Sequence, residues 1–396
     1  MPQMKILVIG VYYASNLGDA VICDCTASLL KKQFPEASIE IADLCGRHDF
    51  VPQKRRTEKE QKQINRDDKK YKWITKWTPW DFAYKVKFGA AVSVFPYIDE
   101  LCGKSYDLAV FAGGQLFMDW LSPYVCRFVE NFQKKQVPVL FHACGTGPAV
   151  SPKLRKMLKE ALCASCVRFI STRDDRETIE KWYTKGKKEV VSTYDPALWA
   201  AEQYGIARQK SDVIGLGIMF AANLNPEKVI KFWVRLIREM EARNLRWRIF
   251  CNGDMDDFVF GEHVLNQIPE LEKDHSKYRM PCPKQPNELV REIAQFQSII
   301  SFRLHSHIIA GSLGIPGVAI VWDEKLSFYY RNLGCEERCM TIQASPKEVL
   351  RRLAQAEEEG CPTERIRQQR QYARDRLLDA VRQCSYELET AQKGKL

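Results

Sequence analysis

The stretch SFRLHSHIIAGSLGIP, residues 301–316, places an arginine and two histidines in a run that is otherwise apolar or small. An arginine binds carboxylate or phosphate groups through paired hydrogen bonds, and a histidine exchanges protons near neutral pH. A buried arginine without an anionic partner is very costly, and this stretch holds no acidic residue. We therefore expect a bound anionic substrate to supply the counter-charge of Arg303. We expect His307, in contrast, to pack or hydrogen-bond within the fold.

Two glycine-containing segments nearer the N-terminus have features of ligand-binding loops. In GVYYASNLGD, Asn16 and Asp19 stand where a helix is expected to begin, so they either cap that helix or approach a ligand. This segment lacks the GxGxxG spacing, and a dinucleotide site is not indicated. In FAGGQLF, Gly113 and Gly114 directly follow a strand. They either let the backbone approach a bound group closely or simply form a turn.

Polar residues also stand at the ends of three further strands. His142, in HACGTGP, is either a hydrogen-bonded core histidine or a substrate-binding residue. Arg173, in STRDDRE, precedes a helix whose N-terminus favours anions. It either binds a carboxylate or phosphate, or pairs with an aspartate to brace the turn. Asp195, in YDPALW, is interpreted as a turn former.

The elements that must position these residues alternate along the chain. KILVIGVYY, DLAVFAGG, VPVLFHACGTGP and RFISTRD are apolar runs typical of buried strands, and amphipathic helical segments separate them. DVIGLGIMF, LRWRIFCNG, SIISFR and GVAIVW form a second series. The pattern predicts an α/β fold with two Rossmann-like domains, residues 1–205 and 206–396, that face a cleft. In such folds ligands bind beyond the carboxyl ends of the strands.

Two segments depart from this alternation. Residues 46–104 interrupt the first domain with a basic, charged run that contains Trp73, Trp77 and Trp80. The segment is either a solvated helical hairpin or a surface that contacts anionic lipid headgroups. The C-terminal PTERIRQQRQYARDRLLDAVRQCSYELETAQ is expected to form one long amphipathic helix that crosses back to the first domain.

The composition narrows the range of partners and of locations. The 396-residue chain has a net charge of +10, which favours an anionic partner. No nucleic-acid-binding signature accompanies the charge, so we expect no nucleic acid. We find neither a signal peptide nor a membrane-spanning segment, and fourteen cysteines without a signal are typical of reduced thiols. We expect a cytoplasmic protein that contacts at most the inner face of a membrane. The CxxC pair, Cys163 and Cys166, is interpreted as core, and no metal site is expected.

Taken in order, these motifs resemble the polysaccharide pyruvyl transferase family from about residue 5 to about residue 333. The motifs are NLGD, the GG pair, GTGP, RD, DPAL, and RLHS followed by AGSLGIP. The resemblance implies a fold like that of the GT-B glycosyltransferases, with an N-terminal acceptor domain and a C-terminal donor domain. It implies that Arg303, Leu304 and His305 bind phosphoenolpyruvate and that Arg173 is a further anion contact. His142 stands where many relatives have GQGxGP.

The implied reaction transfers a pyruvyl group from phosphoenolpyruvate to two hydroxyls of a glycan and forms a pyruvate ketal. We expect Arg303 to hold the donor and His305 to transfer protons. No metal or cofactor is required, and a polyprenyl-linked glycan is the acceptor we favour. Two alternatives remain open: a GT-B glycosyltransferase that uses a nucleotide sugar, and a non-catalytic protein of glycan assembly.

Overall fold

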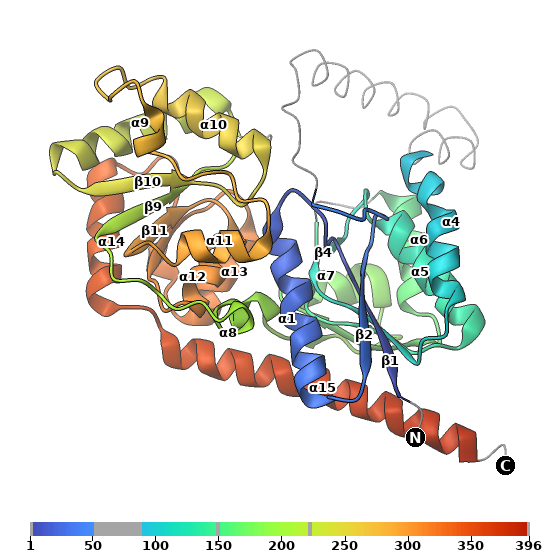
Figure 1. Ribbon diagram of the computed structural model, residues 1–396. Coiled ribbons are helices and arrows are strands. Elements are labelled where there is room, and N and C mark those ends of the chain that lie inside the picture. The colour runs from blue at the N-terminus through green and yellow to red at the C-terminus, as the bar shows by residue number, and fades with distance from the viewer. Residues whose placement is uncertain (1–2, 51–88, 148–150, 221–223, 394–396) are drawn as a thin grey trace.

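The computed structural model describes residues 3–50, 89–147, 151–220 and 224–393 of the chain. It contains two large parallel sheets, each built from one half of the sequence and covered by helices (Figure 1). Both faces of such a sheet are buried, which explains why its strands appear in the sequence as continuous apolar runs. The predicted α/β fold with two Rossmann-like domains is confirmed.

The first sheet has the strand order β2-β1-β3-β5-β7-β8, and all its pairings are parallel. Its strands are β1 (Lys5–Gly10), β2 (Ser38–Asp43), β3 (Leu108–Phe111), β5 (Val139–Phe141), β7 (Val167–Thr172) and β8 (Val191–Ser192). The helices of this domain are α1 (Leu17–Gln33), α4 (Gly89–Gly103), α5 (Ser122–Lys135), α6 (Pro152–Leu162), α7 (Arg176–Ile179), the π-helical turn η1 (Glu180–Thr184), the 3-10 turn η2 (Pro196–Trp199) and α8 (Ala200–Tyr204).

A small parallel sheet of β4 (Gly114–Phe117) and β6 (Cys144–Thr146) lies beyond the first sheet. We did not predict these two strands. The backbone φ angles of Gly113 and Gly114 are +104° and +84°, values that favour glycine. These angles redirect the chain, so that the segment after β3 pairs a second time with the segment after β5.

The second sheet has the order β10-β9-β11-β12-β13 and is also parallel. Its strands are β9 (Val213–Gly217), β10 (Arg246–Phe250), β11 (Ser298–Ser301), β12 (Gly317–Ile320) and β13 (Cys339–Met340). The helices are α9 (Pro226–Ala242), α10 (Met255–Leu265), α11 (Pro286–Ile293), α12 (Leu304–Ser312), α13 (Glu324–Leu333), α14 (Pro346–Glu359) and α15 (Thr363–Lys393), with short 3-10 turns at His275–Lys277 and Glu336–Arg338.

One hydrophobic core spans both domains. It includes Ile6 and Val8 of β1 together with Ile299 of β11 and Ile308 of α12. The opposite faces of the two sheets pack into separate cores. Helix α15 then runs along both domains, as the sequence predicted (Figure 1). The domains are therefore joined by buried apolar surface as well as by the chain itself.

Three expectations concern features outside the sheets. Most of the basic-aromatic insertion, residues 51–88, lies outside the described residues, so its predicted surface is not seen. Within the described part of the chain, no helix is long and apolar enough to cross a membrane. All fourteen cysteines are free thiols, and the thiols of Cys163 and Cys166 donate to backbone carbonyls.

Candidate active site

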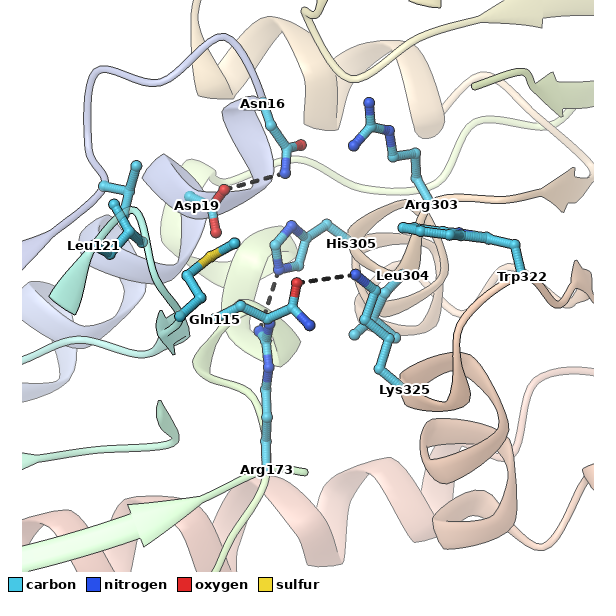
Figure 2. A pocket seen from close by; sticks show the side chains of 12 residues that line it. Asn16, Asp19, Gln115, Leu121, Arg173, Arg303, Leu304, His305, Trp322 and Lys325 are labelled. Carbon is cyan, nitrogen blue, oxygen red and sulfur yellow. Dashed lines mark hydrogen bonds between the residues drawn. The ribbon is translucent and has the colours of Figure 1, made fainter. Parts of the chain in front are cut away.

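A cavity of about 230 Å³ lies between the domains, at the carboxyl ends of strands from both sheets (Figure 2). Ligand pockets commonly measure about 300 to 1,000 Å³, so this cavity suits a compact ligand. Six of the predicted site residues line it: Asn16, Asp19, Arg173, Arg303, Leu304 and His305. The remaining lining residues are Val11, Gln115, Met118, Leu121, Trp322 and Lys325.

Arg303 follows β11 and occupies the N-cap position of α12. Its Nε and Nη2 donate to Oδ2 of Asp257 at 2.8 and 2.6 Å, while 22% of its side chain stays exposed. The prediction that a bound substrate supplies its counter-charge is therefore wrong, because Asp257 of α10 supplies it. Burial raises the pKa of Asp257 to about 6, although Arg303 acts in the opposite direction. The carboxylate is ionised at neutral pH.

Neither Ser306 nor His305 caps helix α12. No side chain accepts the amide hydrogens of the first turn. Ser306 instead donates from its hydroxyl to Oδ1 of Asn252 at 2.8 Å. The carbonyl of Asn252 accepts from the amide of Leu17 at 2.9 Å, which joins the second domain to the start of α1. The polar groups at this helix start thus fix how the domains meet.

His305 is 6% exposed and reaches across the domain boundary (Figure 2). Its Nε2 lies 3.2 Å from Nη1 of Arg173. A guanidinium can only donate, so Nε2 accepts and Nδ1 carries the proton. Burial, followed by the charges of Arg173 and Lys325, holds the pKa of His305 well below its usual value. The ring is neutral, and an anion that offsets those cations would raise the pKa.

Gly18, in the first turn of α1, explains how His305 can lie so close to the first domain. A Cβ atom at Gly18 would stand 2.2 Å from Nδ1 of His305, well inside van der Waals contact. The same added atom would also lie 2.4 Å from Cβ and 2.4 Å from Cγ of His305. Only glycine lets the ring pack against this helix.

Arg173, at the end of β7, forms an ion pair with Asp195, and both side chains are almost fully enclosed. Asp195 also accepts from the amide of Ala197 at 2.8 Å, which caps η2. The turn-bracing pair that we had considered is therefore present. The same guanidinium contacts His305, so bracing and contact with the cavity are combined in one residue.

Asp19 contributes a carboxylate to the wall formed by the first domain. Its Oδ2 accepts from Nδ2 of Asn16 at 3.1 Å, so Asn16 orients Asp19 rather than capping α1. Burial raises the pKa of Asp19, against the effects of Arg173 and the other nearby cations. A Cβ at Gly114 would lie 3.2 Å from Oδ1 of Asp19. Gly114 thus does not line the cavity but leaves room for a residue that does.

Lys325 and Gln115 are lining residues that we did not predict. Lys325 of α13 donates from Nζ to Oε1 of Gln115 in β4 at 3.2 Å, a second contact across the cavity. The same Nζ lies 3.3 Å from Oδ2 of Asp323 and 4.8 Å from the ring centroid of Trp322. Burial lowers the pKa of Lys325. Lys325 follows β12 as Arg303 follows β11, so the rule of strand ends covers Lys325 but not Gln115, which lies within β4.

His142, Gly113 and His307 lie away from the cavity. His142 is fully buried within the first domain, where its Nδ1 lies 3.4 Å from the hydroxyl of Ser171. A Cβ at Gly113 would meet the carbonyl of His142 at 3.2 Å, so this glycine permits close backbone packing. His307 lies between a carbonyl of β11 and the hydroxyl of Tyr330, as expected of a structural histidine. The described residues contain no His, Cys, Asp or Glu cluster suited to a metal.

Comparison of the sequence with protein families matches residues 16–324 to the model described as polysaccharide pyruvyl transferase. The matched range includes ten of the twelve residues that line the cavity, and Val11 and Lys325 lie just outside it. The chain belongs to the polysaccharide pyruvyl transferase family. The resemblance carried by the NLGD and RLHS motifs is thereby confirmed. No curated protein matches this chain.

Solved structures that resemble this chain show its architecture. Staphylococcus aureus MnaA, solved with UDP, has a TM-score of 0.57 at 12% identity, with 98% of this chain and 97% of that chain covered. A putative UDP-N-acetylglucosamine 2-epimerase from Listeria monocytogenes scores 0.58 at 12% identity and 97% coverage of both chains. A trehalose 6-phosphate synthase from Burkholderia multivorans scores 0.53 at 13% identity and 98% coverage of both. These likenesses confirm the predicted GT-B-like fold.

Proposed function

We propose that this member of the polysaccharide pyruvyl transferase family uses phosphoenolpyruvate as its donor and forms a pyruvate ketal on two hydroxyls of a glycan. The observation that carries the proposal is the convergence of Arg173, Arg303 and Lys325 on one compact cavity that also holds His305 (Figure 2). Phosphoenolpyruvate carries a carboxylate and a phosphate, and guanidinium and ammonium groups bind both. A compact dianionic or trianionic donor fits this set of side chains.

The proposed reaction balances without a metal or a further cofactor. The bond between C2 of the donor and the phosphate oxygen breaks, and C2 forms two bonds to acceptor oxygens. The methylene carbon takes a proton and becomes a methyl group, and the second hydroxyl proton leaves with phosphate. Positive charge develops at C2 after protonation. The site must therefore move protons while it holds two anionic groups.

The cavity residues divide these tasks between the two walls. Arg303 and Lys325 hold the anionic groups of the donor from the second domain. His305 transfers protons, because donor charge beside Arg173 would bring its low pKa back toward neutrality. Asp19 of the first domain, with its pKa raised by burial, accepts a hydrogen bond from an acceptor hydroxyl. The donor thus lies on the C-terminal domain and the acceptor on the N-terminal domain.

We propose a glycan carried on a polyprenyl lipid as the acceptor, presented to a cytoplasmic enzyme at the inner face of a membrane. The net charge of +10 supports a site for anionic groups. The free state of all fourteen cysteines supports a reducing compartment.

A second candidate is transfer from a nucleotide sugar, since MnaA of the same fold was solved with UDP. A nucleotide ribose is commonly held by a carboxylate of the second domain. Among the described residues of that domain, none that lines the cavity is acidic, and Asp257 is engaged with Arg303. The arrangement favours a donor of concentrated negative charge over a nucleoside.

Thermal unfolding with candidate donors tests the proposal, because a ligand that binds the folded state raises the melting temperature. We expect phosphoenolpyruvate to raise it and UDP- or GDP-sugars to leave it unchanged. Arg303→Ala should remove the shift, and Arg331→Ala, a surface arginine paired with Glu336, should retain it. A shift with nucleotide sugars alone would overturn the proposal. With lipid-linked glycans, absence of phosphate release would favour a non-catalytic protein.

A further inference from the structure

Helix α6 and the turn η1 pack side by side at the surface of the first domain and together present an excess of positive charge. We name this patch the α6–η1 surface. Its basic residues are Lys153, Arg155, Lys156 and Lys159 of α6, and Lys181, Lys185 and Lys187 of η1 and the turn after it. The carboxylates interspersed with them belong to Glu160, Glu180 and Glu189, and that of Glu180 pairs with Arg176 at 2.8 Å. The patch is strongly cationic at neutral pH.

Most of these cations have no carboxylate partner. Exposed cations on other helices commonly pair within one turn, as Arg351 does with Glu348 at 2.7 Å. Within the described part of the chain, no ion pair is formed by five of the seven residues: Lys156, Lys159, Lys181, Lys185 and Lys187. Unpaired like charges repel one another, and an anionic partner would offset that repulsion.

Two exposed tryptophans accompany the charge. Trp182 of η1 is 37% exposed, and the guanidinium of Arg155 lies 3.9 Å from its ring centroid. Trp120, in the loop between β4 and α5, is 58% exposed. Tryptophan is enriched at membrane–water interfaces, where its ring suits the boundary between headgroups and acyl chains. Lysines with long aliphatic stems are suited to the same boundary.

The surface adjoins the wall of the cavity. Met118 and Leu121, which flank the loop of Trp120, both line the cavity. Oδ1 of Asp119, in the same loop, accepts from the amide of Ser151 at the start of α6 at 2.8 Å. A molecule held at the α6–η1 surface is therefore next to the wall of the first domain, where we place the acceptor.

We propose that the α6–η1 surface, together with Trp120, binds this protein to an anionic lipid bilayer. Clusters of four to eight basic residues beside aromatic side chains are typical of surfaces that bind acidic lipids. An acidic glycan or a nucleic acid would use the same charges and would stack on aromatic rings, but the guanidinium of Arg155 already lies over one face of the Trp182 ring. This proposal concerns membrane binding rather than the transfer reaction. Membrane binding is measured without donor or acceptor, so this proposal and the proposed function can fail separately.

Sedimentation of the full-length protein with vesicles tests the proposal. We expect it to bind vesicles of phosphatidylcholine with phosphatidylglycerol and not vesicles of phosphatidylcholine alone. Each basic residue near an anionic surface strengthens binding about fivefold. Lys181→Glu, Lys185→Glu and Lys187→Glu combined should therefore weaken it by about 100-fold or more. High salt should also weaken it, since the Debye length falls from about 10 Å at 0.1 M to about 3 Å at 1 M.

The control variant changes a basic face that lacks an exposed tryptophan. Lys228→Glu with Lys231→Glu alters two exposed lysines of α9, on the second domain. It should leave vesicle binding within about threefold of the native protein. Trp120→Ala with Trp182→Ala should reduce the part of the binding that survives high salt. All these side chains are exposed, so unchanged thermal unfolding should show that each variant folds.

Three results would overturn the proposal. The first is equal binding to vesicles with and without phosphatidylglycerol, and the second is no vesicle binding at all. The third is native-like vesicle binding by the triple lysine variant, which would place the membrane contact elsewhere on the chain. If the triple variant instead loses retention on a homopolymeric RNA while vesicles never bind, the surface serves a nucleic acid.

Discussion

The two walls of the cavity differ in how far their arginines are exposed. Arg173 of the first domain is closed off by Asp195, and 6% and 4% of the two side chains are exposed. Arg303 of the second domain keeps 22% exposure beside Asp257. Each arginine follows a strand of its own sheet and pairs with an aspartate of its own domain. The first wall thus holds Arg173 in place beside His305, and the second wall leaves part of the Arg303 guanidinium exposed to bind an anion.

His305 is where the two walls meet, and its loss should give the largest effect. His305→Ala should lower the turnover number with phosphoenolpyruvate and acceptor by about 100- to 10,000-fold, the usual contribution of a proton-transfer residue. Phosphate release measures it. The donor-induced thermal shift should persist, because Arg303 and Lys325 remain. If His305→Ala instead loses donor binding, His305 is a binding residue. The proposed difference between the roles of the two walls would then be wrong.

Gly18→Ala should disturb the same residue from the opposite wall. The added methyl group would stand 2.2 Å from Nδ1 of His305, so the ring must move. A displacement of about 1 Å can cost about 100-fold in rate, and phosphate release should fall by that order. In a His305→Ala background the same change should add little, since the group it displaces is gone. Additive losses would show that Gly18 acts in some other way.

The residues in these predictions were not equally easy to predict from the sequence. Arg303 and His305 were found because polar residues in an apolar run contradict the pattern around them. Asp257 and Lys325 were missed, although each closely follows a strand, because their helices α10 and α13 were not predicted. His142 was counted among the site residues although it lies away from the cavity, because the residues at the end of a strand include buried positions as well as positions that face the cavity. Strand order and pairing partners depend on long-range packing, which periodicity along the chain does not contain.

Lys325 tests whether the second wall alone holds the donor. Lys325→Ala should raise the KM for phosphoenolpyruvate about 30-fold and change the turnover number less, because it removes one cation from the donor side. Gln115→Ala removes only the neutral partner across the cavity, and its KM should stay within about threefold. Initial rates of phosphate release over a donor series measure both. Equal effects of the two variants would mean that closure of the cavity matters more than charge.

Replacing Asp257 should give the smallest of these effects. Its effect on donor affinity should also depend most strongly on pH. In Asp257→Asn an oxygen still orients Arg303, but the charge that competes with the donor is gone, so donor affinity at pH 8 should rise about tenfold. Burial raises the pKa of Asp257 to about 6, so the native carboxylate becomes protonated as the pH falls through 6. At pH 5 it is mostly neutral, and the two proteins should then bind phosphoenolpyruvate almost equally. Comparing the two at each pH cancels the titration of the donor itself, and calorimetry measures the affinities. A constant ratio from pH 5 to pH 8 would show that Asp257 and the donor do not share Arg303.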